Sequence, residues 1–349
     1  MQLLSRSALL NSVRIAAVSL LLLVLVATTA ISIAWHNRPS IDDADLAAAP
    51  QLPRGADTVT VRWLGVSNLL IDDGETQLLI DAYFTRPELR RMLLGEPVQS
   101  DAASVNTALA RYRMDRLAAV IPSHSHFDHT LDLGAIANRT DAVVFGSPSS
   151  ARIARGAGVP EEQLSIVTER TSRDFGQFRV TLHPSVHAPI APGKTVPFSG
   201  SIDAPLPQPA PIKAFRAGIT FTIVIEHPQG TMVVNTSAGF REPALVDVNA
   251  DVVFLGTALL KRLGEAYTRE YWIAMVTATG AKTVYPVHFD DYTRPLGETV
   301  LLPSMIDDFA GNIAWLRRAR DLWDPDVRIY RPEFNEPIVV FPPSEDADT

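Results

Sequence analysis

The stretch His124-Ser125-His126-Phe127-Asp128-His129 decides how this sequence is interpreted. It directly follows Ala118–Pro122, a continuous apolar run that is typical of a strand buried on both faces. Alternate side chains of extended backbone share a face, so the first two histidines project together, and a turn at Phe127 lets Asp128 and His129 point to a neighbouring position. Imidazole and carboxylate are ligands suited to Zn²⁺, Mn²⁺ or Fe²⁺. The stretch therefore predicts a site for two metal ions at the edge of a sheet.

The composition limits the other possibilities. The 349 residues include no cysteine, which excludes disulfides, thiolate ligands and a cysteine nucleophile, so any metal must be held by histidine and carboxylate. With 46% hydrophobic and 20% charged residues the chain is globular rather than disordered. The net charge of −8 makes the body repel a phosphate backbone, so we expect no nucleic-acid partner.

The N-terminal run Ile15–Trp35 carries no charged residue. It matches the roughly 20 apolar residues that a helix needs to cross a bilayer, whereas the apolar region of a cleaved signal is usually about 7–15 residues. Arg6 and Arg14 precede the run and Asp42 follows it, so the positive-inside rule places the body on the exported side. We expect a single-pass anchor in the cytoplasmic membrane, with a periplasmic or extracellular body. A cleaved signal and a buried core helix are the alternatives.

Three segments are expected: an anchor over residues 1–36, a linker over 37–56 that is rich in Pro, Ala and Asp, and a folded domain over 57–345. In the domain, strands come first, helices and strands then alternate, and strands with terminal helices close the chain, which indicates two sheets faced by helices. Strands are expected at 58–64, 67–71, 77–81, 118–122, 142–145, 164–167, 178–184, 219–226, 231–235, 251–255, 283–287, 327–330 and 338–341, and helices at 104–117, 132–138, 149–156, 268–279 and 305–322.

The segment Pro189–Pro211 is rich in proline and has no period. A loop of more than about 15 residues is usually functional or disordered. We expect either a lid over the metal site or a plain surface insertion.

The motif His124-x-His126-x-Asp128-His129 matches the HxHxDH signature of the metallo-β-lactamase-fold hydrolases. The resemblance extends to Trp63–Ile71 and to Leu79-Ile80-Asp81, which look like the opening strands of that family, and it covers roughly residues 58–342. The surrounding sequence is most similar to the branch of the ascorbate-phosphate lactonases and the N-acylphosphatidylethanolamine phospholipase D enzymes. This resemblance implies an α/β fold, a four-layer αβ/βα sandwich, with the metals at one edge of the paired sheets.

The resemblance also implies further site residues. His187, after the apolar strand ending at Val186, corresponds to the third histidine of the first metal, with His183 as the alternative. His288, at the end of a late strand, corresponds to the last histidine of the second metal. Asp81 corresponds to an aspartate that orients a ligand histidine, because ligating imidazoles commonly donate their other N–H to a carboxylate. The alternative for Asp81 is a turn at the end of a strand.

For three further polar residues the sequence gives a less specific prediction. Asp290 and Asp291 follow His288 closely and are expected either to face the site or to form a solvated loop pair. His227 lies in an expected hairpin turn and is expected in solvent.

The sequence departs from the family at the aspartate that usually bridges the two metals. The corresponding segment Val233–Phe240 contains no carboxylate. This leaves two ligand sets, similar to those of the subclass B3 β-lactamases: His124, His126 and His187 for one metal, and Asp128, His129 and His288 for the other. The missing bridge argues against phosphodiester hydrolysis and for a second site that is only partly occupied.

The resemblance implies a hydrolase that uses a metal-bound hydroxide on an ester, lactone, amide or phosphodiester, and the N-terminal run adds the expectation that it is exported and membrane-tethered. Two Zn²⁺ ions, or Mn²⁺ or Fe²⁺, are the expected cofactors, and Asp128 is the expected catalytic residue, which orients the hydroxide and accepts its proton. A small-molecule or lipid-like substrate is expected. The alternatives are a non-catalytic metal-binding protein of the same fold and a β-lactamase with a B3-like ligand set.

Overall fold

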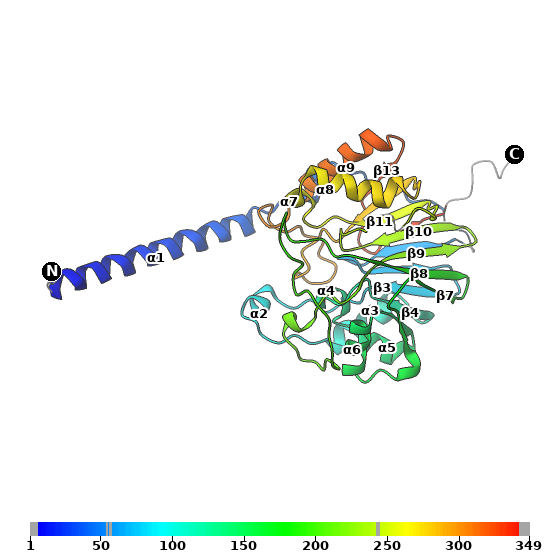
Figure 1. Cartoon of the computed structure of the whole chain (residues 1–349), viewed down its shortest axis with the longest axis horizontal. Helices are drawn as coiled ribbons and strands as arrows, with labels where there is room; N and C mark the ends of the chain where they lie inside the picture. Colours follow the sequence, from blue (N-terminus) through cyan, green and yellow to red (C-terminus); the bar gives the residue numbers. More distant parts are fainter. Residues whose placement is uncertain (1–5, 54, 56–57, 242–244, 342–349) are drawn as a thin grey trace.

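Two mixed sheets of seven strands each face one another, and helices cover their outer faces (Figure 1). The computed structural model describes residues 6–53, 55, 58–241 and 245–341, so the expected domain boundaries at 57 and 345 lie outside the described residues. The first sheet has the order β14 (Pro337–Val339), β1 (Thr60–Trp63), β2 (Leu69–Asp72), β3 (Gln77–Ile80), β4 (Leu117–Ile121), β5 (Val143–Gly146) and β6 (Leu164–Ile166). The second has the order β13 (Arg328–Ile329), β12 (Thr283–Val287), β11 (Val252–Gly256), β10 (Gly230–Asn235), β9 (Thr220–His227), β8 (Phe178–Ser185) and β7 (Thr171–Phe175).

The helices pack mainly on the outer faces of the sheets. They are α1 (Arg6–His36), α2 (Leu89–Leu93), α3 (Ala102–Arg111), α4 (Phe127–Thr130), α5 (Leu133–Thr140), α6 (Pro148–Gly156), α7 (Leu260–Leu263), α8 (Glu265–Trp272), which continues as a π-helix over Ile273–Thr277, and α9 (Phe309–Trp323). The expected α/β sandwich is confirmed. Strand β7 and the short helices α2, α4 and α7 were not predicted, because elements of a few residues leave too little periodicity to recognise.

The strand directions bring the site-forming loops to one edge. Strands β3, β4, β5 and β6 run parallel, and so do β10, β11 and β12, while β8 and β10 are both antiparallel to β9 and therefore share a direction. Carboxyl ends of strands that run in one direction meet at one edge of a sheet. The two edges also join across the sandwich, because the Phe221 N–H donates to the carbonyl of Ser123 at 2.8 Å.

Large apolar side chains fill the space between the sheets. Trp63, Phe178, Phe221 and Phe254 are fully buried there, in one continuous cluster. Each such side chain contributes roughly 1.5–3 kcal/mol on burial, so this core holds the strand ends in fixed positions.

Helix α1 projects away from the body (Figure 1). Within its segment Leu10–His36, an 18-residue window has a mean hydropathy of 2.5, and no residue of that window is buried. By length and composition it is a candidate membrane span, and it contains the predicted run Ile15–Trp35.

The segment that was expected to be a linker packs against the domain. Ser40 caps a short 3₁₀ turn, Ile41–Ala44, and this turn contacts α9. Leu46 and Ala49 are buried in the main core, and Ala48 forms a β-bridge with Arg331. The apolar residues here are too few to show a period in the sequence, which is why the packing was not predicted. Residues 40–49 hold the end of α1 to the body rather than acting as a free tether.

Candidate metal centre

The motif that follows β4 lies at the edge of the first sheet. Strand β4 ends at Ile121, and the chain turns through Ser123 and His124 before α4 begins at Phe127. Ser123 is fixed from two sides, since its N–H donates to Asp81 Oδ1 at 2.7 Å and its hydroxyl accepts from Thr236 Oγ1 at 2.7 Å. Both sheets therefore hold this turn in place.

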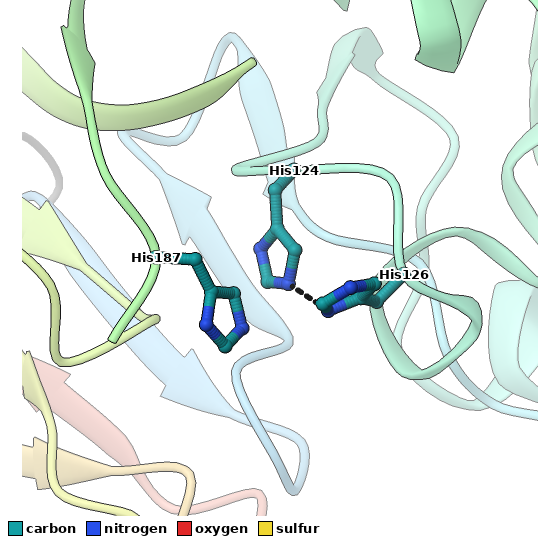
Figure 2. Close-up of side chains that lie close together, drawn as sticks. All are labelled: His124, His126 and His187. Carbon is teal, nitrogen blue, oxygen red and sulfur yellow. Dashed lines mark hydrogen bonds between the residues drawn. The ribbon is translucent and has the colours of Figure 1, made fainter. Parts of the chain in front are cut away.

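Two groups of donors converge at this edge. The first cluster consists of His124, His126 and His187, and the second of Asp128, His129 and His288; within each cluster the donor atoms all lie within 4.8 Å of one another. Figure 2 shows the three rings of the first cluster directed at a common point. The two clusters adjoin, since the rings of His124 and His129 are 3.9 Å apart between centroids. The structure thus brings together all six residues that the sequence analysis names as metal ligands.

His187 reaches the first cluster from the other sheet, two residues beyond β8. The backbone around it passes very close to Gly239, where an added Cβ would lie 2.0 Å from the carbonyl oxygen of Val186. A side chain at 239 would therefore push His187 out of place. His183 lies on β8 itself and is not among the clustered donors.

Hydrogen bonds on the far side of three rings fix which nitrogen carries the proton. His187 Nδ1 lies 2.6 Å from the carbonyl of Ala188, His126 Nε2 lies 3.0 Å from the carbonyl of Pro197, and His129 Nδ1 lies 2.7 Å from Asp81 Oδ2. A carbonyl or carboxylate oxygen only accepts, so these nitrogens are the protonated ones.

The remaining nitrogens then point into the clusters with free lone pairs. His124 Nε2 and His126 Nδ1 approach to 2.9 Å, and His129 Nε2 and His288 Nε2 to 3.2 Å. Neutral imidazoles with convergent lone pairs are what a divalent cation requires of its ligands. The residues present therefore fit a divalent metal.

The electrostatics of the first cluster favour neutral rings. Burial, together with the neighbouring histidines, lowers the pKa of His124 well below its ordinary value. Burial lowers the pKa of His126 to about 4 and that of His187 to about 3. Protons therefore compete little for these nitrogens at neutral pH.

The carboxylates of Asp128 and Asp81 determine the electrostatics of the second cluster. Burial alone would raise the pKa of Asp128, but His129 and His288 beside it hold that pKa well below the ordinary value. Burial acts to lower the pKa of His129, and the carboxylates of Asp81 and Asp128 outweigh it, so the pKa is raised. This cluster carries the negative charge of the site.

Asp81 lies where the resemblance implies. It is fully buried, and besides His129 it accepts hydrogen bonds from Ser67 Oγ at 2.6 Å and from the Ser123 N–H. Its backbone has a φ of 58°, and Val66 and His288, which are joined by a 2.7 Å backbone hydrogen bond, have φ values of 51° and 58°. Left-handed conformations at non-glycine residues cost of order 1–3 kcal/mol and gather at functional sites.

The structure also shows where Asp290, Asp291 and His227 lie. Asp290 and Asp291 are buried and not a solvated pair: Asp290 Oδ1 accepts from the Val66 N–H at 2.7 Å, and Asp291 pairs with Arg38 at 2.7 Å. The expectation that His227 lies in solvent is wrong. Its side chain is 3% exposed because the hairpin turn lays the ring against Phe178, with 5.0 Å between ring centroids.

A cavity of about 370 Å³ opens over both clusters. The first half of the Pro-rich segment lines one wall of this cavity through Pro189, Ile190, Pro197 and Phe198, which is the position expected of a lid, and a role as a lid stays a prediction. The second half is tied to the body, since the Ile202 and Leu206 N–H groups donate to Ser149 and Arg152.

The opposite wall consists of residues that sequence reasoning missed. They come from α7 and the residue before it and from the segment between β12 and α9, and they include Leu259, Arg262, Tyr292, Leu302 and Ile306. Nothing in their local sequence distinguishes them, because they reach the cavity only through the packing of distant loops. Thr236 and Ser237, from the segment without a bridging carboxylate, also line the cavity.

Comparison with known proteins agrees with this geometry. Residues 61–209 match the family model of the metallo-beta-lactamase superfamily. The chain is 32% identical to a metal-dependent hydrolase of Heliobacterium modesticaldum over 127 residues, which is 36% of this chain and 44% of that protein. It is 29% identical to one of Chloroflexus aurantiacus over 106 residues, 30% of this chain and 43% of the relative. The chain thus spans less than half the length of these relatives.

Solved structures show the same fold at low identity. A possible metal-dependent hydrolase from Veillonella parvula has a TM-score of 0.50 at 16% identity, covering 81% of this chain and all of its own. CmlA, a diiron beta-hydroxylase from Streptomyces venezuelae, has a TM-score of 0.52 at 12% identity, covering 82% of this chain and 55% of its own.

Proposed function

We propose that this chain, which carries a metallo-β-lactamase superfamily domain, is a metal-dependent hydrolase tethered to the cytoplasmic membrane by α1, with its body on the exported side. The observation that carries the proposal is the pair of donor clusters at the cavity floor, with ring tautomers set for metal binding by Asp81 and by the carbonyls of Pro197 and Ala188. The metal-dependent hydrolases among its relatives support the same reaction class.

In this proposal His124, His126 and His187 hold one ion, and Asp128, His129 and His288 hold the other. A divalent ion in such a site supplies Lewis acidity and lowers the pKa of water at its open position. One neighbour of this fold is described as a diiron protein, so the choice of metal includes iron as well as zinc and manganese.

Asp128 is the residue for which we propose a part in the chemistry. Its carboxylate lies at the cavity floor, with Oδ2 3.4 Å from His288 Nε2 and 3.6 Å from His129 Nε2. From there it orients the attacking water by accepting a hydrogen bond from it and takes up the proton that the water releases.

The walls select the substrate. Ile190 and Phe198 face the cavity from the Pro-rich segment, and Leu302 and Ile306 face it from the other side, so an apolar group on the substrate is buried beside the reacting bond. A lipid-like or otherwise amphiphilic ester, lactone or amide fits these walls. A phosphodiester is less favoured, because the segment at Thr236 and Ser237 offers no carboxylate between the clusters.

Turnover by the purified full chain tests the proposal. Hydrolysis of p-nitrophenyl esters, a lactone and a p-nitrophenyl phosphodiester is measured before chelation, after chelation, and after return of Zn²⁺, Mn²⁺ or Fe²⁺. We expect chelation to abolish ester or lactone hydrolysis and one of the metals to restore it. Metal binding without turnover of any substrate would favour the alternative of a non-catalytic metal-binding protein.

A β-lactamase is the second candidate, favoured by the B3-like ligand set. Nitrocefin hydrolysis that depends on metal would establish it, and its absence alongside ester hydrolysis would remove it.

The location has its own test. A fusion after residue 349 to alkaline phosphatase, which folds only outside the cytoplasm, is expected to be active, while a cytoplasmic reporter at the same place is expected to be silent. The reverse pattern would refute export, and recovery of the body in the soluble exported fraction would show a cleaved signal instead of an anchor.

A further inference from the structure

Two hollows adjoin where α1 joins the body, and both are distinct from the cavity described above, although Ile306 borders that cavity as well as one of them. One is a groove of about 610 Å³ between the last turns of α1 and the surface formed by α2 and the loop at Met305. The other is a hollow of about 780 Å³ between α1 and α3. Trp35 and Leu89 line both of them, so the two adjoin. Figure 1 shows that α1 leaves the body on the side where α2 lies.

The groove is apolar. Its lining includes Ile31 of α1, Leu89 and Leu93 of α2, and Met305. Leu93 is 77% exposed and Met305 66%. A soluble protein rarely gathers large apolar side chains in this way, whereas a membrane-facing surface does. Because these side chains adjoin the candidate membrane span, the bilayer rather than water is the surrounding that suits them.

The hollow is lined by four arginines and only two acids: Arg38, Arg86, Arg111 and Arg294, with Glu88 and Asp101. The arginines outnumber the acids by two, and the Asp101 carboxylate is already engaged as the cap of α3, where it accepts from the Ser104 N–H at 2.8 Å.

Two of these arginines are poorly compensated. The Arg86 side chain is 5% exposed, its nearest carboxylate is Asp290 at 3.8 Å, and its buried Nε has no hydrogen-bond partner among the described residues. Leaving a buried polar atom unpaired costs about 1–3 kcal/mol, so a bound acceptor would be favourable there. Within the part of the chain that the structure describes, Arg111 makes no ion pair. The other two are paired, Arg38 with Asp291 and Arg294 with Glu298.

We propose that this junction binds one anionic phospholipid of the membrane that surrounds α1, with the phosphate in the arginine hollow and the acyl chains along the groove. The proposal rests on the membrane tether of the proposed function. The position of the hollow along α1 agrees with a bound phospholipid. Trp35 lies at the end of the apolar helix, where aromatic side chains mark the membrane interface, and Arg38 packs 5.2 Å from the centre of its ring. Arginine forks suit phosphate oxygens, which adds recognition to the charge.

The test uses the full chain in neutral detergent and follows its thermal unfolding midpoint while lipid is added. A ligand that binds only the folded state raises this midpoint. We expect phosphatidylglycerol to raise it by at least about 2 °C, since each kcal/mol of stabilisation shifts a protein of this size by that order. Phosphatidylcholine should act clearly less, and inorganic phosphate, which has no chains for the groove, should have no effect.

Variants of exposed residues test whether the shift of the unfolding midpoint arises at the junction. The double variant Arg111→Gln/Arg294→Gln should reduce the phosphatidylglycerol shift to the level of phosphatidylcholine, and Leu93→Ser/Met305→Ser should reduce the shifts of both lipids. Matched controls lie outside both hollows: Arg179→Gln on β8, with a side chain that is 56% exposed, and Leu322→Ser on α9, with a residue that is 72% exposed, should respond like the unaltered chain.

Three outcomes would overturn the proposal. They are equal shifts with both lipids in every variant, equal losses in the controls and the junction variants, or a full shift with inorganic phosphate, which would indicate a phosphate site without a lipid. The measurement involves no turnover and no export, so its failure is distinct from a failure of the hydrolase proposal.

Discussion

Replacing Asp81 by asparagine isolates the contribution of one buried carboxylate to the proposed metal binding. The backbone at this position has a φ of 58°, which asparagine adopts more readily than most residues, so the substitution changes the donor pattern with little backbone strain. Asp81 Oδ2 accepts from His129 Nδ1 at 2.7 Å and from Ser67 Oγ at 2.6 Å. Oδ1 accepts from the Ser123 N–H and must remain an oxygen, so the new amide nitrogen faces His129.

The amide then donates where the carboxylate accepted. His129 is driven to the tautomer with the proton on Nε2, and that nitrogen can no longer offer a lone pair to the second cluster. Loss of a carboxylate that orients a ligand histidine typically weakens metal binding 10- to 100-fold, which corresponds to about 1.4–2.7 kcal/mol. We expect a loss in this range for one of two ions, measured by calorimetric titration of the metal-free protein with Zn²⁺.

Asp132→Asn is the matched control. This carboxylate is also buried and accepts from the N–H groups of Phe84 and Thr85 and from the Ser100 hydroxyl, but it contacts none of the clustered donors. The control should lose stability against urea and keep its metal affinity. If both variants lost affinity equally, or if Asp81→Asn left it unchanged, the inference that Asp81 sets the tautomer of His129 would be refuted.

Three further expectations follow from the two clusters. His126→Ala should strip at least one metal and abolish activity, whereas His183→Ala should leave the metal content by elemental analysis nearly unchanged; the reverse result would mean that the third ligand is misassigned. Ser237→Asp should tighten the weaker metal in a calorimetric titration, because it places negative charge beside the cavity between two dications, and a single unaltered binding event would contradict the dinuclear interpretation. The metal-free protein should lose stability as the pH falls from about 6.5 towards 4. The pKa values of His126 and His187 are lowered to about 4 and 3, so the unfolded chain binds more protons in that window; urea midpoints that do not change between pH 7 and 4.5 would contradict this.

The sequence carried the fold and most of the site because the relevant signals are local. An apolar strand that runs directly into the stretch from His124 to His129 places four donors at one sheet edge, whatever the rest of the chain does. The strand ends at His187 and His288 could be assigned only through resemblance, since nothing in their own surroundings says which sheet edge they reach. The segment before β1 was misjudged for a related reason. The turn Ile41–Ala44 contacts α9 and Ala48 pairs with Arg331, and both partners lie far away in the chain.

What the sequence could not reveal is the set of contacts made by backbone carbonyls and by charges from distant segments. The proton on His126 is placed by the carbonyl of Pro197, and a carbonyl is offered by every residue, so no side-chain pattern announces it. The same contact explains why the Pro-rich segment matters. Its first half both walls the cavity and holds a ring of the first cluster, so shortening it would alter metal affinity and substrate access together. The arginine hollow is of the same kind, since its four arginines come from four separate parts of the chain and lie together only in the folded protein.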